Sequence, residues 1–192
     1  HAACYPLRNT GRARVRNGST VTADGTVTIT ATDALSDDEK SRIEADAGGV
    51  AIALALASKS STTVNVTFGV SVAINDIENT IESLVDDSTV TAGGDLALTA
   101  ESDIEIDALT IAGALSGTVA SQQGGLTVDI AGAGAGSGNT ITNTVSATIE
   151  NGSTVTTNNG GDVSLLATDD STIGAIAGAV SLQGKAMSYN NY

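Results

Sequence analysis

Three pairs of adjacent aspartates are the residues of this chain best placed to do chemistry: Asp37–Asp38, Asp86–Asp87 and Asp169–Asp170. Paired carboxylates can act as acid and base, or as nucleophile, in the cleavage of polysaccharides. Each pair lies beside a predicted turn, however, where aspartate is favoured for its local hydrogen bonding. A lyase would also need cations near the carboxylates to stabilise an enolate. After residue 16 the chain has only Lys40, Arg42, Lys59 and Lys185. We therefore expect no enzymatic activity, and a catalytic β-helix acting on polysaccharide is the alternative.

The chain lacks the residues that other common catalytic and cofactor sites require. The chain has one histidine, His1, and one cysteine, Cys4, so neither a Ser-His-Asp nor a Cys-His arrangement can be assembled, and a zinc site lacks ligands. The glycine-rich stretch "AGAGAGSGN" (131–139) has neither the G-x-G-x-x-G spacing nor the lysine of a phosphate loop. We expect no catalytic, cofactor-binding or metal-binding residues.

Calcium is the one cofactor that the acidic turns could bind, because carboxylates stacked along a rod could hold Ca²⁺ between coils. The stretch "GGDLALTAE" (93–101) nevertheless lacks the glycine spacing of calcium-binding β-rolls. Solvated acidic turns that keep the protein soluble explain the same residues better. A calcium-binding module stays an alternative.

Threonine pairs suggest a second kind of surface, one that orders water as ice-binding proteins do. Thr20/Thr22, Thr89/Thr91 and Thr154/Thr156 each flank a valine expected to point inward. If every repeat made three coils, these pairs would recur only every ~14 Å and form no continuous lattice. Outward-facing strand formers are then the simpler explanation.

Composition limits both the core and the partners. Apolar residues make up 41% of the 192 residues but aromatic residues only 2%, which favours thin layers of Val, Ile, Leu and Ala. All 22 acidic residues and four of the eight basic ones lie in residues 17–192, so this part carries 4 − 22 = −18. Such a charge excludes nucleic acid as a partner. The longest apolar run, "VAIALALA" (50–57), is too short for a membrane-spanning helix.

The sequence contains three copies of one repeat unit. "STVT" begins at Ser19, Ser88 and Ser153, and "NDIENTI" (75–81) is matched by "NTITNTV" (139–145). The units are 17–85, 86–150 and a truncated 151–192, together one β-solenoid repeat domain. Residues 1–16 form a basic segment outside the repeat. The asparagines that recur in register, Asn75, Asn79, Asn139 and Asn143, predict a structural role, either at a turn where their side chains satisfy backbone groups or in a ladder between coils.

Each unit has three phases of alternating apolar and polar residues separated by Gly, Asn and Asp, which is the pattern of strands and turns. Three phases per unit predict an all-β fold, a parallel β-helix-like solenoid with about 22 residues per coil. "SDDEKSRIEADA" (36–47) begins with an N-cap and acidic residues, which favours a short helical insertion or a loop there.

"STVTAGGDLALTA", a Gly/Ala-rich run and "N-x-I-x-N-T-V" resemble the repeats of large exported bacterial β-helical adhesins, the filamentous-haemagglutinin-like surface proteins. The resemblance covers residues 17–188. It implies a structural or adhesive stalk segment of a secreted protein at the bacterial cell surface. Expected partners are neighbouring repeats, copies joined through open coil ends, and a host surface or matrix polysaccharide. We expect no membrane insertion, and we interpret the chain as a fragment of a longer protein.

Overall fold

The computed structural model describes residues 2–33, 41–57, 62–120 and 126–187, and within these ranges the chain forms strands and turns but no helix. The strands are β1 (Ala2–Val15), β2 (Thr20–Ala23), β3 (Val27–Thr32), β4 (Ser41–Ala57), β5 (Thr63–Asp86), β6 (Thr89–Ala92), β7 (Leu96–Ser102), β8 (Ile104–Ala120), β9 (Thr127–Glu150), β10 (Thr154–Thr157), β11 (Val163–Asp169) and β12 (Thr172–Met187).

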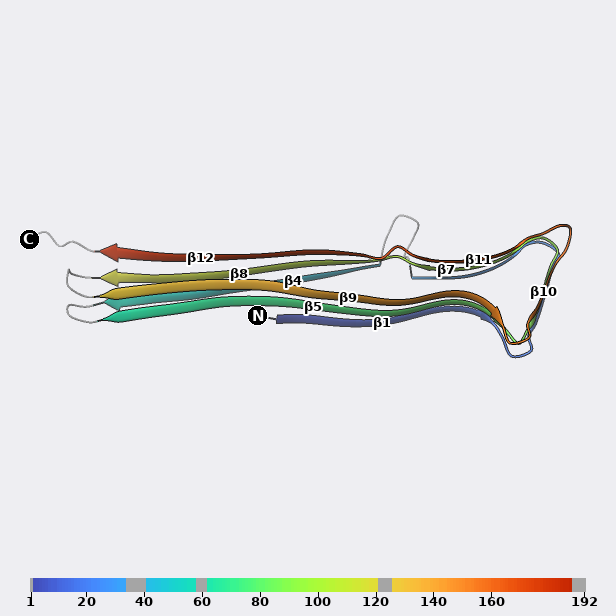
Figure 1. The fold of residues 1–192 in the computed structure, drawn as a ribbon, viewed down its shortest axis with the longest axis horizontal. Helices are drawn as coiled ribbons and strands as arrows, with labels where there is room; N and C mark the ends of the chain where they lie inside the picture. Colours follow the sequence, from blue (N-terminus) through green and yellow to red (C-terminus); the bar gives the residue numbers. More distant parts are fainter. Residues whose placement is uncertain (1, 34–40, 58–61, 121–125, 188–192) are drawn as a thin grey trace, which may run out of the picture.

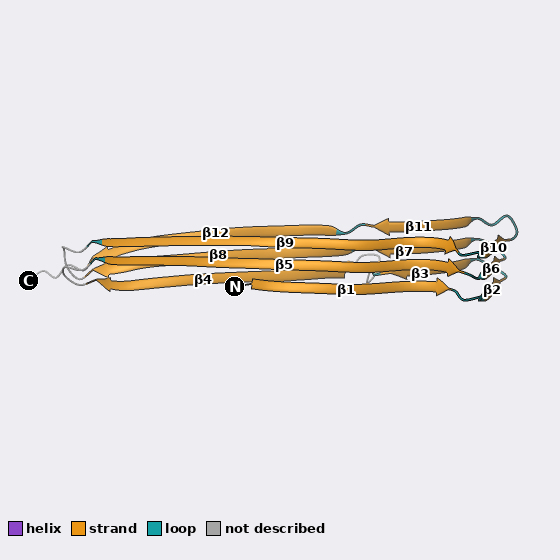
Figure 2. Ribbon diagram, turned by 60° about the horizontal axis from the view of Figure 1, so that its bottom comes forward, coloured by secondary structure: helices purple, strands orange, loops and turns teal. Residues whose placement is uncertain are grey.

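These strands form four parallel sheets of three strands each (Figures 1 and 2). We call them the first long sheet (β1-β5-β9), the tip sheet (β2-β6-β10), the return sheet (β3-β7-β11) and the second long sheet (β4-β8-β12). A coil runs out along the first long sheet, turns through the tip and return sheets, and comes back along the second long sheet. The predicted all-β parallel solenoid is confirmed.

The number of residues between stacked strands differs from the expected 22. Ser19 bonds to Ser88, 69 residues later, and Ser88 to Ser153, 65 residues later. One coil therefore takes about 65 residues, and the three phases of the repeat are successive sides of a single coil. Each of the long strands β5 and β9 has 24 residues, so one phase is close in length to one long strand. Stacking three coils adds only about 10 Å, whereas a 24-residue strand extends about 80 Å, so the molecule is a flat blade.

The basic N-terminal segment forms part of the first coil. β1 pairs in parallel with β5, which places Asn9 and Thr10 beside Asn79 and Thr80. Arg8 forms an ion pair of 2.8 Å with Glu78. Arg12 and Arg14 both pair with Glu82. Residues 1–16 were expected outside the repeat, but within them β1 is an edge strand of the first long sheet, and its arginines pair with acidic residues on the outer face of β5.

The expected helical insertion is not present in its described part. Residues 41–47 belong to β4, and residues 34–40 lie outside the described residues. Along β4 Ile43, Ala45 and Ala47 point inward, while Arg42, Glu44 and Asp46 are exposed. The acidic residues that resemble a first helical turn are therefore the outward positions of a strand, because the burial has a period of two.

The apolar core lies near the tip, between the tip and return sheets and the adjoining ends of the long sheets. Its largest cluster is formed by Ile29, Val85, Val90, Leu96 and Leu98. Val90 is buried, as expected of the valine between Thr89 and Thr91, and so are Leu96 and Leu98. Their counterparts in the third coil, Val163 and Leu165, keep 46% and 45% exposure because that coil has a neighbour on one side only. Val21 and Val155 are partly buried, as are Thr89 and Thr91, while Thr20 and Thr22 are exposed.

The turn between the first long sheet and the tip sheet repeats in every coil. Asn17 and Asn151 have φ of 63° and 52°, and each precedes a glycine with φ above 70°. In the second coil Asp87 stands at the position of these glycines and has φ of 45°. Asn, Asp and Gly are the residues that tolerate this left-handed conformation, so the repeated "NGST" and "DDST" mark the corners of the coil.

Because Leu98 faces inward and Thr91 lies on the outer face, substitution of each by aspartate should affect stability differently. Leu98→Asp would bury a charge without a partner and should lower the free energy of unfolding by several kcal/mol. Thr91→Asp, on the outer face of the tip sheet, should change it by less than about 0.5 kcal/mol. Denaturant melts of both variants test this assignment, and an unfolded Thr91 variant beside a folded Leu98 variant would show that the faces are inverted.

Candidate interaction surface

The half of the blade farthest from the tip, which we call the distal half, has its side chains turned inside out. Along β5, Thr67, Gly69, Ser71 and Ala73 face inward and are buried. The alternate positions are Val66, Phe68, Val70, Val72 and Ile74, which face outward. The same alternate positions face inward beyond Asn75, but there they are apolar. The isoleucines 77 and 81 are buried, and the acidic residues Asp76 and Glu78 are exposed.

Contact between backbones explains this inversion. A Cβ atom placed on Gly69 would lie 2.0 Å from the carbonyl oxygen of Gly113, on the opposite long sheet. A Cβ atom on Gly49 would lie 2.8 Å from the carbonyl oxygen of Val70. Glycine inside a strand marks such a close approach of two backbones. The interior of the distal half therefore has room for Gly, Ala, Ser and Thr, and larger side chains point to solvent.

The thin interior is also polar. The Asn65 side-chain amide donates to the Asp129 carboxylate and to the Thr118 hydroxyl, both at 2.9 Å, and Thr118 donates to Asp129 at 2.7 Å. Among the described residues, the buried hydroxyls of Ser71, Thr110 and Ser116 have no hydrogen-bond partner. An unpaired buried hydroxyl opposes folding by about 1–3 kcal/mol, so the distal half depends on its backbone ladders for stability.

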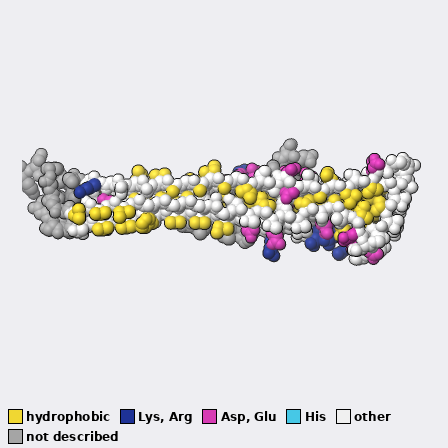
Figure 3. Space-filling view, in the orientation of Figure 1, with side chains coloured by type: hydrophobic (Ala, Val, Ile, Leu, Met, Phe, Trp, Pro, Cys, Tyr) yellow, Lys and Arg dark blue, Asp and Glu magenta, His cyan; other side chains and the backbone are white. Residues whose placement is uncertain are grey.

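Apolar side chains cover both outer faces of the distal half, and their exposed fractions run from 37% to 84%. Figure 3 shows these side chains along one face, with most of the visible charges on the half near the tip. Patches of this extent on soluble proteins mark interaction sites. The residues are Val50, Ile52, Leu54, Leu56, Val64, Val66, Phe68, Val70, Ile74, Leu109, Ile111, Leu115, Val128, Ile130, Ile176, Val180 and Leu182.

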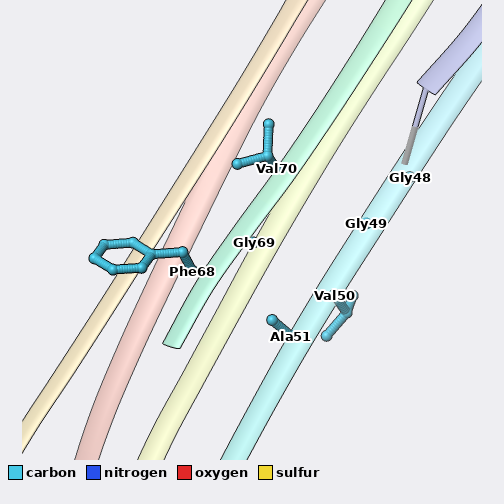
Figure 4. A pocket seen from close by; sticks show the side chains of 7 residues that line it. All are labelled: Gly48, Gly49, Val50, Ala51, Phe68, Gly69 and Val70. Atoms are coloured by element: carbon cyan, nitrogen blue, oxygen red, sulfur yellow. The ribbon is translucent and has the colours of Figure 1, made fainter. Parts of the chain in front are cut away.

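A hollow of about 360 Å³ opens between β4 and β5 in this half. It is lined by residues 48–51 and 68–70, and Figure 4 shows the Phe68 ring directed away from it. Among the described residues β1 begins opposite Val72, and β5 from Thr63 to Ser71 pairs in parallel with β9. The hollow lies beside the part of β5 that precedes its pairing with β1, and the Phe68 ring does not fill it.

Of the two roles expected for the recurring asparagines, the ladder between coils is formed by one pair, and the other two asparagines bond to aspartates. Asn75 donates to Asn139 in the next coil at 2.6 Å. Asn79 donates to Asp33 at 2.8 Å, and Asn143 donates to both carboxylate oxygens of Asp169 at 3.0 Å. The Asn75 amide joins two coils within the first long sheet, whereas the Asn79 and Asn143 amides join that sheet to the end of the return sheet. These roles are structural.

The two aspartate pairs that the structure describes lie at different turns of the coil. Asp86 and Asp87 lie at the turn into the tip sheet, where Asp86 accepts a hydrogen bond of 2.6 Å from Asn151. Asp169 and Asp170 lie where the return sheet meets the second long sheet, and Asp37–Asp38 is outside the described residues. Within the described ranges no three His, Cys, Asp or Glu side chains cluster as metal ligands. No helix in those ranges is long and apolar enough to cross a membrane.

The threonine pairs form continuous columns, contrary to the spacing expected from short coils. Thr20, Thr89 and Thr154 are paired neighbours across the tip sheet, and so are Thr22, Thr91 and Thr156. The corrected coil length is the reason, because each repeat contributes one pair to every coil. The outer face of the tip sheet is thus two columns of threonine, three coils deep.

Comparisons with protein-family models, with curated proteins and with solved structures found no match to this chain.

Because the backbone at Gly69 contacts the opposite sheet, adding one methyl group there should lower stability more than adding it at an open glycine. Gly69→Ala should lower the free energy of unfolding by about 1–3 kcal/mol, because the new Cβ would overlap a carbonyl oxygen that cannot move without shifting a strand. Gly134→Ala is the matched control, since a Cβ there meets no atom within 4 Å. Urea melts should separate the two variants. Equal stability would mean that the sheets are not in contact.

Asp169 should make stability depend on pH. Burial raises the pKa of its carboxyl group, but hydrogen bonds from Ser171 and Asn143 outweigh burial and hold that pKa below its ordinary value. A lowered pKa in the folded state stabilises the fold above the unfolded pKa of about 3.9, and this stabilisation is lost as the pH falls through the folded pKa.

The stability difference between wild type and Asp169→Ala should therefore be largest above pH 4 and shrink as the solution is acidified. Asn143→Ala should weaken this pH dependence, since it removes one of the donors. Chemical denaturation at several pH values measures both effects, and a difference that grows on acidification would contradict the assignment.

Proposed function

We propose that this protein is a structural and adhesive segment of a secreted bacterial surface protein, without catalysis, which acts through its surface. The observation that supports this most is the in-register stacking of three similar coils whose outermost strands have free edges. Such a stack can be extended by further coils of the same kind. The sequence resemblance to exported β-helical adhesins supports the same function and an extracellular location.

Coil length changes how such a segment would work. A coil of 65 residues lengthens the solenoid by only about 4.8 Å, which makes it inefficient as a spacer. The same coil contributes two long strands to the outer surface of the blade. We therefore assign the adhesive role to the broad faces, and we expect the partners to be neighbouring repeats, other copies at the open coil ends, and a host surface or matrix polysaccharide.

End-to-end stacking follows from the free edges. Within the described residues, β9 to β12 pair on one side only, and so do β1 to β4. Unpaired parallel strands template the addition of another strand. The third coil of one copy can therefore continue into the first coil of another.

Proline on the outer edge should block this stacking without disturbing the coil. Asp162 accepts from the Leu96 amide and the Asp170 amide donates to Ser102, both at 2.9 Å. Successive residues of a strand direct their amides to opposite sides, so Ala167 directs its N–H to the free edge. Ala167→Pro should abolish concentration-dependent end-to-end association and leave the circular dichroism spectrum unchanged, because edge strands tolerate proline there.

Asp170→Pro is the matched control, since it removes an internal hydrogen bond and should lower stability. Sedimentation velocity over a wide concentration range measures association. End-to-end assemblies that persist in a folded Ala167 variant would contradict stacking through this edge.

A second candidate function is the ordering of water, and only the threonine columns of the tip sheet favour it. Their spacing between coils is that of adjacent strands, about 4.8 Å. An assay of ice recrystallisation tests it directly. Activity that is lost in Thr91→Asp, at the centre of the array, would support this candidate, and an inactive wild type would exclude it.

A further inference from the structure

The first long sheet carries a ridge and a groove side by side on its outer face. Val70, Val72 and Ile74 of β5 form the ridge, and they pair in register with Gly134, Gly136 and Gly138 of β9, which form the groove. The ridge and groove have the same length and lie one strand spacing apart, about 4.8 Å.

The groove is open. A Cβ atom placed on any of its three glycines meets no other atom within 4 Å. At the neighbouring Gly132 the ring of Phe68 already covers the strand, since a Cβ there would lie 2.7 Å from the ring. The open groove therefore begins where the aromatic ring ends. No charged residue occupies an outward position on β5 from Val64 to Ile74 or on β9 from Val128 to Gly138.

We propose that this face packs against the same face of a second copy. A two-fold axis that runs parallel to the strands, between β5 and β9, places the ridge of each copy over the groove of the other. The face is thus complementary to itself, which is the requirement for a closed two-fold interface. Valine and isoleucine side chains would fill the space above the partner's glycines and leave water on both sides.

A second copy fits this surface better than a lipid bilayer does. A bilayer would cover apolar residues but has no use for an in-register groove. The described sheets also have free backbone edges, and unpaired strand edges do not occur in the hydrocarbon region.

The size of the surface sets the expected affinity. Two strands of about 11 residues cover about 350 Å² on each copy, and each added coil contributes about 170 Å² more. Stable interfaces bury about 800 Å² per partner, so three coils should associate weakly and longer solenoids tightly. Added salt should strengthen the association, because it screens the acidic residues that lie on the same face near the tip.

Three lysine substitutions test the proposal in the Ala167→Pro background, where end-to-end stacking is blocked. Gly134→Lys fills the groove with a charge and Ile74→Lys places one on the ridge. Thr142→Lys, an exposed position of β9 near the tip, is the control with the same change of charge. Circular dichroism and thermal melting check that each variant folds. If Ala167→Pro prevents folding, the three lysine variants are compared in the chain without the proline, because the coil ends are then the same in all of them.

Sedimentation velocity under reducing conditions should show weak dimers of the parent and of Thr142→Lys, with at least a tenfold lower association constant for the groove and ridge variants. Equal association of all four proteins would overturn the proposal. A parent that stays monomeric at millimolar concentration would overturn it as well. So would a monomer that floats with neutral phosphatidylcholine vesicles, which would assign the face to lipid.

Discussion

Backbone contact between the two long sheets is the constraint on which the rest of the distal half depends. Gly69 touches the Gly113 carbonyl so closely that even a methyl group would not fit. With no space for Val, Ile or Leu inside, the alternating pattern of the strands can be satisfied only by placing them outside. The usual arrangement, in which apolar residues fill the core and polar residues meet water, is kept near the tip, where Leu96 and Leu98 are buried.

Each coil therefore has one half that stabilises the fold and another half that exposes an apolar surface. The apolar core near the tip, the asparagine ladders and the ion pairs of β1 hold the coils in register. The distal half contributes backbone ladders and an apolar exterior, and it buries hydroxyl groups that lack partners. Each coil adds little length to the blade but contributes two long strands to its outer surface.

The sequence predicted alternating strands and the period of the repeat, because "STVT" and the asparagines recur at intervals of about 65 residues, but the expected short coils placed the wrong strands next to one another. It did not predict how many strands make a coil, since a 65-residue period fits either one large coil or three small ones. Asn9–Thr10 was missed because two matched residues are too few to recognise. Alternation shows that Val66 and Thr67 face opposite ways, but only the position of the second sheet decides which of them is inside.

Cysteine accessibility along β5 tests the inverted packing most directly. Single cysteines at Val66, Thr67, Phe68 and Ser71 in a Cys4→Ser background can be labelled with a thiol reagent in the folded protein and compared with the urea-unfolded chain. The account predicts rapid labelling at positions 66 and 68 and strong protection at 67 and 71. Protection of the apolar positions with rapid labelling of the polar ones would show an ordinary apolar core and would contradict it.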